Sequence, residues 1–187
     1  MCDEKDIDLL QAWSGGDSRA GDRLIRRHNS TVRRYFNNKV PTGEVADLIQ
    51  ETFLQCTRSL KKFRQEASFQ SFLLGIARNM LRHYYRTHKR RFSRVDPLTH
   101  SVAELSGPGM LTVLQSRGNR EQLRWGMAQL PINLQDALQF KLWEGMTDKE
   151  SAGILEIPEG TYRNRVKRAR QLLCELLTPV DETTTSD

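Results

Sequence analysis

Residues 158–176 have the composition of a helix that binds a polyanion. Five cations lie between Glu159 and Glu175 with no acid among them: Arg163, Arg165, Lys167, Arg168 and Arg170. Val166, Ala169, Leu173 and Leu176 recur at i, i+3, i+7 and i+10, so one helix face can be buried while the basic side chains occupy the others. Guanidinium groups placed in this way can bond to phosphates and to base edges of duplex DNA. The alternative is an amphipathic surface helix whose basic face meets only solvent.

A shorter helix is predicted directly before the basic one. Thr147 and Glu150 have capping-box spacing, with a hydroxyl three residues before a carboxylate, and the segment that they open ends near 155–157. Pro158 then stands near the start of the basic helix. A short helix, a tight connection and a basic helix together predict a helix-turn-helix, whose second helix enters a DNA major groove.

A second basic zone, residues 67–95, contains no acid and interleaves arginines with aromatic residues. Cationic side chains can follow a phosphate backbone, while exposed rings can stack on unpaired bases. We expect Phe72 to be a core residue and Tyr85, which lies closer to the arginines, to be the stacking ring. The zone therefore predicts contact with single-stranded or locally opened DNA. The net charge of +6 over the 187 residues likewise favours a polyanionic partner.

The segment 44–60 differs because its exposed face is acidic. Its apolar residues form a core stripe, and Asp47, Gln50 and Glu51 lie beside the bulky Leu54 on another face. This face would repel DNA and would suit a protein surface rich in basic residues. From the residues alone, a helix face that is simply solvated is the alternative.

The periodicity predicts an all-α protein made of two small helical domains joined by a flexible linker, the second domain being a helix-turn-helix. Residues 1–93 form the first domain, and residues 94–118, which lose periodicity and contain three glycines and two prolines, form the linker. Fully extended, this linker would span roughly 80 Å at about 3.3 Å per residue. Residues 119–177 form the second domain, and residues 178–187 are expected to be a disordered tail.

Motifs for catalysis, metal binding and membrane insertion are absent from the sequence. It contains neither a phosphate-binding loop nor an HExxH zinc motif, and Cys2, Cys56 and Cys174 are too widely spaced for a zinc site. No run approaches the roughly 18 apolar residues of a membrane span, and the acidic N-terminus lacks the order of a signal peptide. We therefore expect a cytoplasmic protein that is not an enzyme and has no cofactor, no catalytic residue, no bound metal and no membrane insertion.

Three stretches, in this order along the chain, resemble the extracytoplasmic-function class of bacterial sigma factors. Asp47-Leu48-Ile49-Gln50-Glu51-Thr52-Phe53 is similar to the motif with which that family grips the clamp helices of core RNA polymerase. Residues 69–79, from Phe69 to Asn79, resemble the segment that recognises and opens the −10 promoter element. Residues 160–170 resemble the recognition helix that reads the −35 element. The resemblance covers most of residues 6–177.

The resemblance implies three groups of contact residues. Core RNA polymerase would be bound by Asp47, Leu48, Gln50, Glu51 and Phe53. The −10 DNA would be contacted by Arg64, Ser68, Phe69, Arg78, Asn79, Arg82, Tyr85 and Arg86, with the loop 64–68 receiving a flipped-out base. The −35 duplex would be contacted by Thr161, Tyr162, Arg163, Asn164, Lys167 and Arg168. Because many relatives are controlled by an anti-sigma factor, such a protein is a further candidate partner beside core polymerase and promoter DNA.

Three residues depart from the family pattern. Phe72 stands in place of the usual tryptophan, and Ser151 stands in place of isoleucine, so we expect the first helix of the helix-turn-helix to pack less tightly. Tyr162 replaces a small β-branched residue, and its ring could reach a phosphate or a base edge.

The implied function is that of an alternative sigma factor, which directs promoter-specific transcription initiation. Two alternatives stay open. A helix-turn-helix regulator that does not partner polymerase would leave the acidic face without a role. An RNA-binding antiterminator would bind RNA more tightly than promoter DNA.

Overall fold

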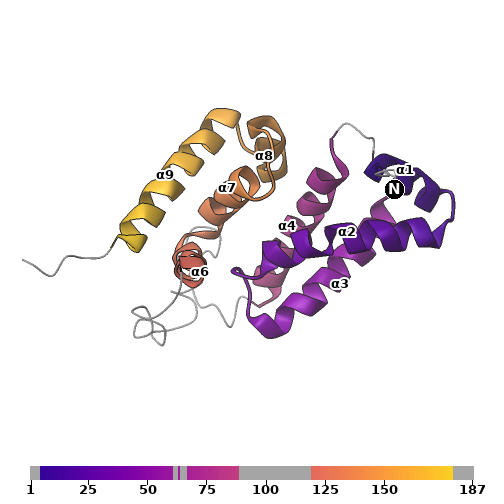
Figure 1. The fold of residues 1–187 in the computed structure, drawn as a ribbon, viewed down its shortest axis with the longest axis horizontal. Coiled ribbons are helices and arrows are strands. Elements are labelled where there is room, and N and C mark those ends of the chain that lie inside the picture. The colour runs from indigo at the N-terminus through magenta and orange to yellow at the C-terminus, as the bar shows by residue number, and fades with distance from the viewer. Residues whose placement is uncertain (1–4, 61–62, 64–66, 89–118, 179–187) are drawn as a thin grey trace, which may run out of the picture.

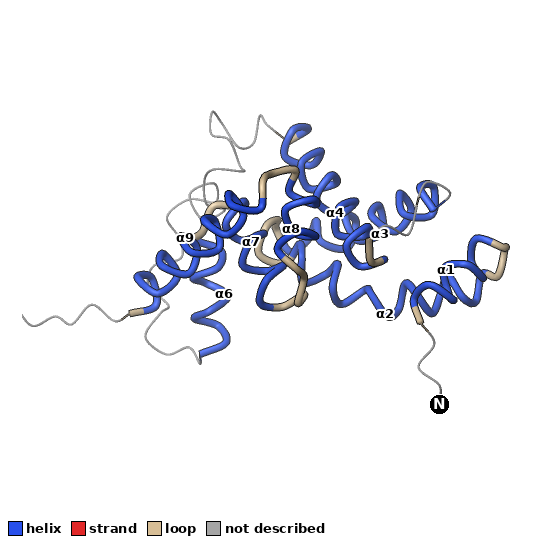
Figure 2. The backbone as a smooth tube through the Cα atoms, turned by 90° about the horizontal axis from the view of Figure 1, so that it is seen from above, coloured by secondary structure: helices blue, strands red, loops and turns tan. Residues whose placement is uncertain are grey.

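The computed structural model describes residues 5–60, 63, 67–88 and 119–178. This part of the chain contains eight helices and no strand, which confirms the expected all-α fold (Figures 1 and 2). The helices are α1 (Asp6–Ser14), α2 (Ser18–Phe36), α3 (Thr42–Ser59), α4 (Phe69–Thr87), α6 (Asn119–Gln129), α7 (Ile132–Leu142), α8 (Asp148–Leu155) and α9 (Glu159–Leu177). We refer to α1–α4 as the N-terminal unit and to α6–α9 as the C-terminal unit. The predicted linker 94–118 lies outside the described residues, as does the predicted tail apart from Thr178.

A tight turn folds α1 back onto α2. Gly16 has φ +102°, a backbone conformation that favours glycine. The carboxylate of Asp17 then caps α2 by accepting hydrogen bonds from the backbone N–H groups of Arg19 and Ala20, at 2.9 and 3.3 Å. The two helices pack so closely that a Cβ atom on Gly21 would lie 2.6 Å from the indole nitrogen of Trp13, so a larger residue here would force the indole ring to move.

The core of the N-terminal unit lies between α2, α3 and α4. Leu24, Phe36, Cys56 and Leu73 are fully buried there, in keeping with the periodic apolar stripes of the sequence. Helix α1 buries Leu9 and Leu10 against the rest of this unit, whereas Ile7 is 41% exposed.

The C-terminal unit is built around α7, which is buried along most of its length. Helix α9 packs against it through Val166 and Ala169, and Leu173 packs against Gly126 of α6. Leu176, one turn further along α9 and predicted to share this face, is 37% exposed because it lies near the end of the helix.

Helix α7 lies between α9 and the N-terminal unit (Figure 1). It therefore buries polar side chains on the side away from α9: Asp136 and Gln139 both reach Lys39, which follows α2. The two units are thus in direct contact through polar groups, an arrangement that the periodicity of the sequence did not predict.

Candidate nucleic-acid and protein interfaces

The local sequence sets the geometry of the helix-turn-helix. The hydroxyl of Thr147 accepts from the backbone N–H of Glu150 at 3.2 Å, and the Glu150 carboxylate accepts from the backbone N–H of Thr147 at 3.0 Å, which completes the predicted capping box. Helix α8 ends at Leu155 and is capped by Glu156, whose left-handed backbone (φ 56°) turns the chain toward α9. Pro158 occupies the N-cap position of α9.

Helix α9 separates its buried and exposed residues as its periodicity predicted. Val166 and Ala169 face the core, whereas the exposed side chains include five of the six predicted −35 contacts: Thr161, Arg163, Asn164, Lys167 and Arg168. A row of amide and cationic groups along one helix can bond to base edges and phosphates in a major groove.

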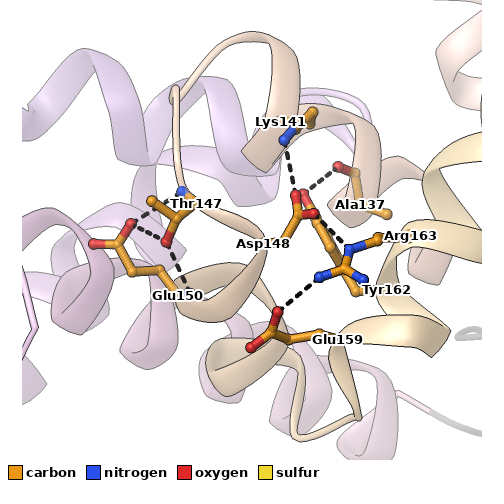
Figure 3. Close-up of polar contacts among 8 residues, drawn as sticks. All are labelled: Ala137, Lys141, Thr147, Asp148, Glu150, Glu159, Tyr162 and Arg163. Carbon is orange, nitrogen blue, oxygen red and sulfur yellow. Dashed lines mark hydrogen bonds and ion pairs between the residues drawn. The ribbon is translucent and has the colours of Figure 1, made fainter.

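Arg163 is held in place by two carboxylates (Figure 3). Its Nε donates to Asp148 at 3.0 Å, and one Nη donates to Glu159 at 3.0 Å. Asp148 also accepts from Lys141 at 2.8 Å, so it connects α7, α8 and α9. The hydrogen bond from Lys141 and, to a smaller extent, the one from Arg163 lower the pKa of Asp148, which keeps this carboxylate ionised.

Tyr162 lies on the opposite side of α9 from the exposed contacts. Its ring is fully buried, and its hydroxyl donates to the backbone carbonyl of Ala137 at 3.1 Å (Figure 3). Burial raises the pKa of this hydroxyl, and the neighbouring hydroxyl of Ser151 acts in the other direction. Since Ser151 is also fully buried, the small side chain on α8 and the large one on α9 share one site in the core. The expectation that this ring reaches DNA finds no support in the structure.

The predicted −10 contacts are distributed over different environments. Asn79 and Arg86 are exposed on α4, and Ser68 is exposed at its N-terminus, where its hydroxyl accepts from the backbone N–H of Ser71 at 3.1 Å. Phe69 and Tyr85 are each 5% exposed, and the Tyr85 hydroxyl donates to the backbone carbonyl of Lys39. Tyr85 is therefore a core residue and not the exposed stacking ring that the sequence suggested. Arg64 lies outside the described residues.

The other two predicted −10 contacts, Arg78 and Arg82, are bonded to the C-terminal unit. The two Nη atoms of Arg78 donate to the backbone carbonyls of Ile154 and Leu155 at 2.9 and 3.2 Å, and Arg78 is only 9% exposed. Arg82 donates to the carboxylate of Glu156 at 3.1 Å. Both guanidinium groups thus lie at the C-terminal end of α8.

Lys39 is the most deeply buried cation at the contact between the units. Its side chain is 1% exposed, and its Nζ lies 3.1 Å from the carboxylate of Asp136, which is 2% exposed. The same Nζ donates to Gln139 at 2.8 Å and to the Tyr35 carbonyl at 2.9 Å, and it lies 3.7 Å from the centre of the Tyr35 ring. Burial lowers the pKa of Lys39, and Asp136 opposes this shift.

A second ion pair joins the units at Glu144. Arg34 donates to both carboxylate oxygens, at 2.9 and 3.0 Å, and Gln70 donates at 2.9 Å. The Glu144 side chain is 1% exposed, so its carboxylate is shielded from solvent. The hydrogen bond that Arg34 donates to Glu144 raises the pKa of Arg34.

The acidic face of α3 is turned away from these contacts. Asp47, Gln50 and Glu51 are exposed, and Leu54 beside them is 50% exposed. Leu48 is half-buried, and Phe53 is 7% exposed and belongs to the core. The polar residues of the predicted polymerase-binding motif therefore form one accessible surface, and Phe53 supports it from inside.

The sequence did not indicate the roles of Lys39, Asp136 and Glu144. Each stands in a segment whose neighbours gave no motif, and a single charged residue on an amphipathic helix is usually solvated. The sequence feature that comes closest to predicting them is the apolar α7 segment, in which the single acid, Asp136, suggests a buried cationic partner.

Two families of sigma factor domains match the chain. The family Sigma-70 region 2 matches residues 24–91, and the family Sigma-70, region 4 matches residues 120–173. The extracytoplasmic-function RNA polymerase sigma-E factor of Escherichia coli (strain K12) is 28% identical over 179 residues, which cover 92% of this chain and 94% of that protein. The protein of the same name from Haemophilus influenzae is 26% identical, with 92% and 95% coverage.

Solved structures share the fold. CnrH, in complex with the cytosolic domain of CnrY, superposes with a TM-score of 0.68 at 23% identity, over 93% of this chain and 97% of that chain. The sigma factor RpoE of Bartonella quintana, in complex with the anti-sigma factor NepR, gives 0.67 at 18% identity, over 86% and 97%. The chain therefore belongs to the extracytoplasmic-function class of the sigma-70 factors.

The described residues contain neither a candidate membrane span nor a candidate metal site. None of the described helices combines the length and the apolar character needed to cross a bilayer. Nor do the described residues bring three or more His, Cys, Asp or Glu side chains together as a metal site.

Proposed function

We propose that this sigma factor binds core RNA polymerase in the cytoplasm through α3 and directs initiation at promoters whose −35 element is read by α9. The observation that carries this proposal is the pairing of two accessible surfaces of opposite charge in one chain. The acidic face of α3 suits a basic protein surface, whereas the exposed residues of α9 suit duplex DNA. A DNA-binding regulator that does not partner polymerase would need only the second surface.

The roles of single residues follow from exposure. Asp47, Gln50 and Glu51 would contact polymerase, with Leu48 at the edge of the contact and Phe53 supporting it from the core. On α9, Arg163 and Arg168 are suited to guanine, Asn164 to adenine, and Thr161 and Lys167 to either phosphate or base. Tyr162 would act by fixing α9 in the helix-turn-helix and not by touching DNA.

The −10 element would be opened without nucleotide hydrolysis by this chain. Extruding a base costs a few kcal/mol, and capture of the unpaired strand by the protein offsets that cost. Asn79, Arg82 and Arg86 on α4, with Arg78 and the loop 64–68, are the residues assigned to this capture. The buried Phe69 and Tyr85 would position α4.

Each domain would have its own binding partner. Residues 1–93 would serve polymerase and the −10 element, residues 119–177 would serve the −35 element, and residues 94–118 would connect them as a linker. An anti-sigma factor is a further proposed partner, because the solved structure of RpoE contains the anti-sigma factor NepR and that of CnrH contains the cytosolic domain of CnrY.

The test is reconstituted transcription with core polymerase across a library of genomic DNA fragments. Promoter-specific starts that depend on the chain are expected, and Asp47→Arg should abolish both these starts and co-elution with core polymerase. Asp22→Arg, which makes the same charge change at an exposed position of α2, is the matched control and should do neither. A folded chain that binds DNA but never co-elutes with polymerase would instead identify the regulator.

A further inference from the structure

Helix α2 has a row of arginines that belongs to none of the surfaces assigned above. The helix contains six arginines and a single acid, Asp22. Four of the arginines stand at i, i+4, i+7 and i+14 and are all exposed: Arg19, Arg23, Arg26 and Arg33. Positions with this spacing share one face of a helix. We call these four residues the arginine row.

The arginine row points away from the core of the N-terminal unit. The opposite face of α2 buries Leu24, Val32 and Tyr35, and through that face α2 meets α3 and α4. The arginine row is therefore on a different side of the unit from the α2-facing sides of α3 and α4, and it is open to solvent.

The charge of the arginine row is not compensated within the described part of the chain. The guanidinium groups of Arg19, Arg26 and Arg33 form no ion pair with another described residue, and neither does the exposed carboxylate of Asp22. Arg34 shows the contrast, because it is the next residue after Arg33 and is paired with Glu144. A line of like charges that is left in this way attracts a polyanion.

The side chains around the arginine row favour one class of polyanion. No large hydrophobic side chain of α2 is exposed, whereas a helix that binds a membrane surface needs exposed Trp, Phe or Leu, and a protein interface needs apolar or aromatic anchors. The rings of Tyr35 and Phe36 are fully buried, so α2 offers none of these rings for stacking on unpaired bases. Cations without such anchors suit the backbone of duplex DNA.

The length of the arginine row also suits a duplex. Between Arg19 and Arg33 the helix rises about 21 Å, at about 1.5 Å per residue. This distance corresponds to about six base-pair steps of about 3.4 Å. The planar guanidinium group can donate two hydrogen bonds to one phosphate. Ser30, which is exposed between Arg26 and Arg33, is too short to keep a phosphate backbone away from them.

We propose that the arginine row binds the phosphate backbone of duplex DNA without regard to sequence. It is a further DNA-binding surface, separate from the residues of α4 and α9 that the proposed function assigns to the promoter elements. Phosphate contacts fix the position of a duplex but carry no sequence information. The N-terminal unit would in this way hold double-stranded DNA as well as the opened strand.

The test compares two full-length variants that have lost the same net charge. The row variant replaces three arginines of α2 with glutamine, which is a good helix former: Arg19→Gln, Arg26→Gln and Arg33→Gln. Arg23 is left in place because it has an interaction partner within the chain. The control variant replaces three exposed cations outside α2: Lys5→Gln, Arg58→Gln and Arg124→Gln. Circular dichroism should show the same helix content in the parent and in both variants.

The first measurement is the affinity for a fluorescein-labelled duplex of mixed sequence, about 30 base pairs long, between about 50 and 200 mM salt. Loss of three phosphate contacts should make the dependence of log K on log salt shallower by about 2.7, at about 0.9 per phosphate. The control variant should keep the slope of the parent. The ratio of control affinity to row-variant affinity should therefore shrink by about 40-fold over this range of salt.

The second measurement locates the duplex on the protein. A photo-crosslinker is attached to Ser30→Cys, within the arginine row, or to Thr57→Cys, at an exposed position of α3, in a background in which Cys2 and Cys174 are serine. Cys56 is buried, and burial raises the pKa of its thiol to about 12, so it should not react. Crosslinks to the duplex are expected from Ser30→Cys and not from Thr57→Cys.

The results that would overturn the proposal are distinct. A change of slope below about 0.9, less than one phosphate, would show that the arginine row is only solvated. Equal crosslinking from both positions would place the duplex elsewhere. Weaker binding of the row variant to phosphatidylglycerol vesicles or to a single strand, with unchanged duplex binding, would identify a different partner.

The proposed function is tested separately, because these measurements use the chain without polymerase. In the transcription assay the folded row variant should still co-elute with core polymerase and start at the same positions as the parent. Loss of co-elution would assign the arginine row to polymerase and would overturn the inference. An absence of polymerase-dependent starts with the parent chain would refute the proposed function and leave the duplex titration unaffected.

Discussion

The shared core site of Ser151 and Tyr162 makes a quantitative prediction about the helix-turn-helix. Both side chains are fully buried and in contact, with a small residue on α8 and a large one on α9. Exchanging the sizes, by combining Ser151→Ile with Tyr162→Val, should preserve the total volume. Either change alone should not.

The magnitudes follow from packing. Tyr162→Val empties most of a ring's volume and removes the hydrogen bond to the Ala137 carbonyl, which should lower the free energy of unfolding by roughly 3 kcal/mol. Ser151→Ile forces extra methylene groups against the Tyr162 ring and should cost about 1–3 kcal/mol. If the volumes compensate, the double variant should lose only about 1–2 kcal/mol, which gives a coupling of about 2–5 kcal/mol between the two sites.

The assay is thermal and urea unfolding of the four proteins in a double-mutant cycle, followed by circular dichroism. For a chain of this size about 1 kcal/mol corresponds to roughly 2–4 °C in Tm, so Tyr162→Val should melt about 6–12 °C below the parent. Tyr162→Phe isolates the hydroxyl and should cost only about 1 kcal/mol. Additive single-variant effects, with coupling under about 0.5 kcal/mol, would show that the two side chains do not share a site and would refute the reasoning.

Two further predictions concern the charges around the helix-turn-helix. Asp148→Asn should loosen the orientation of Arg163 and remove a charge that repels phosphates. In titrations with promoter and non-promoter duplexes, the affinity for non-promoter DNA should rise, and the ratio of promoter to non-promoter affinity should fall by roughly two- to five-fold. An unchanged ratio would contradict a positioning role for Asp148. Hydrogen bonds from the backbone and side chain of Thr147 lower the pKa of Glu150 in the folded protein. Ionised Glu150 therefore stabilises the fold above the pKa of about 4.3 that it has in the unfolded chain, and this stabilisation is lost as the pH falls through its lower pKa in the folded state. In unfolding experiments between pH 3 and 7, Glu150→Gln should lose less stability at acid pH than the parent. At neutral pH it should lower the free energy of unfolding by about 1 kcal/mol, because the cap is weaker. An identical pH dependence in both proteins would exclude the Glu150 carboxylate as the source of the loss.

Local sequence patterns predicted the helices and the helix-turn-helix well. Capping at Thr147 and the apolar periodicity of α9 each depend on residues within a few positions of one another. The exposed row on α9 was predictable for the same reason, since the face opposite Val166 and Ala169 has to meet solvent or a ligand. At the end of α9 the same reasoning assigned Leu176 to the core, and it failed because a helix end can extend past the helix that it packs against.

The periodicity of the sequence could not predict which polar residues are buried. Arg78 and Tyr85 occupy an arginine-rich helix that looked exposed, yet one is bonded to the end of α8 and the other to the carbonyl of Lys39. Tyr162 was expected to reach a phosphate or a base edge because it stands at the start of the segment that resembles a recognition helix, yet its ring is buried. A side chain's neighbours in sequence do not reveal which distant helix covers it.

The sequence by itself determined that this protein is built from helices, that its last two described helices form a helix-turn-helix, and that α3 and α9 present faces of opposite charge. These properties arise from hydrogen bonds and side-chain spacing within single helices, which the order of residues specifies directly. Only the tertiary structure decided that Lys39 meets Asp136, that Arg78 and Arg82 meet the end of α8, and that Ser151 makes room for Tyr162. These contacts join helices far apart in the chain, and their energies depend on burial and distance, which exist only once the helices have packed.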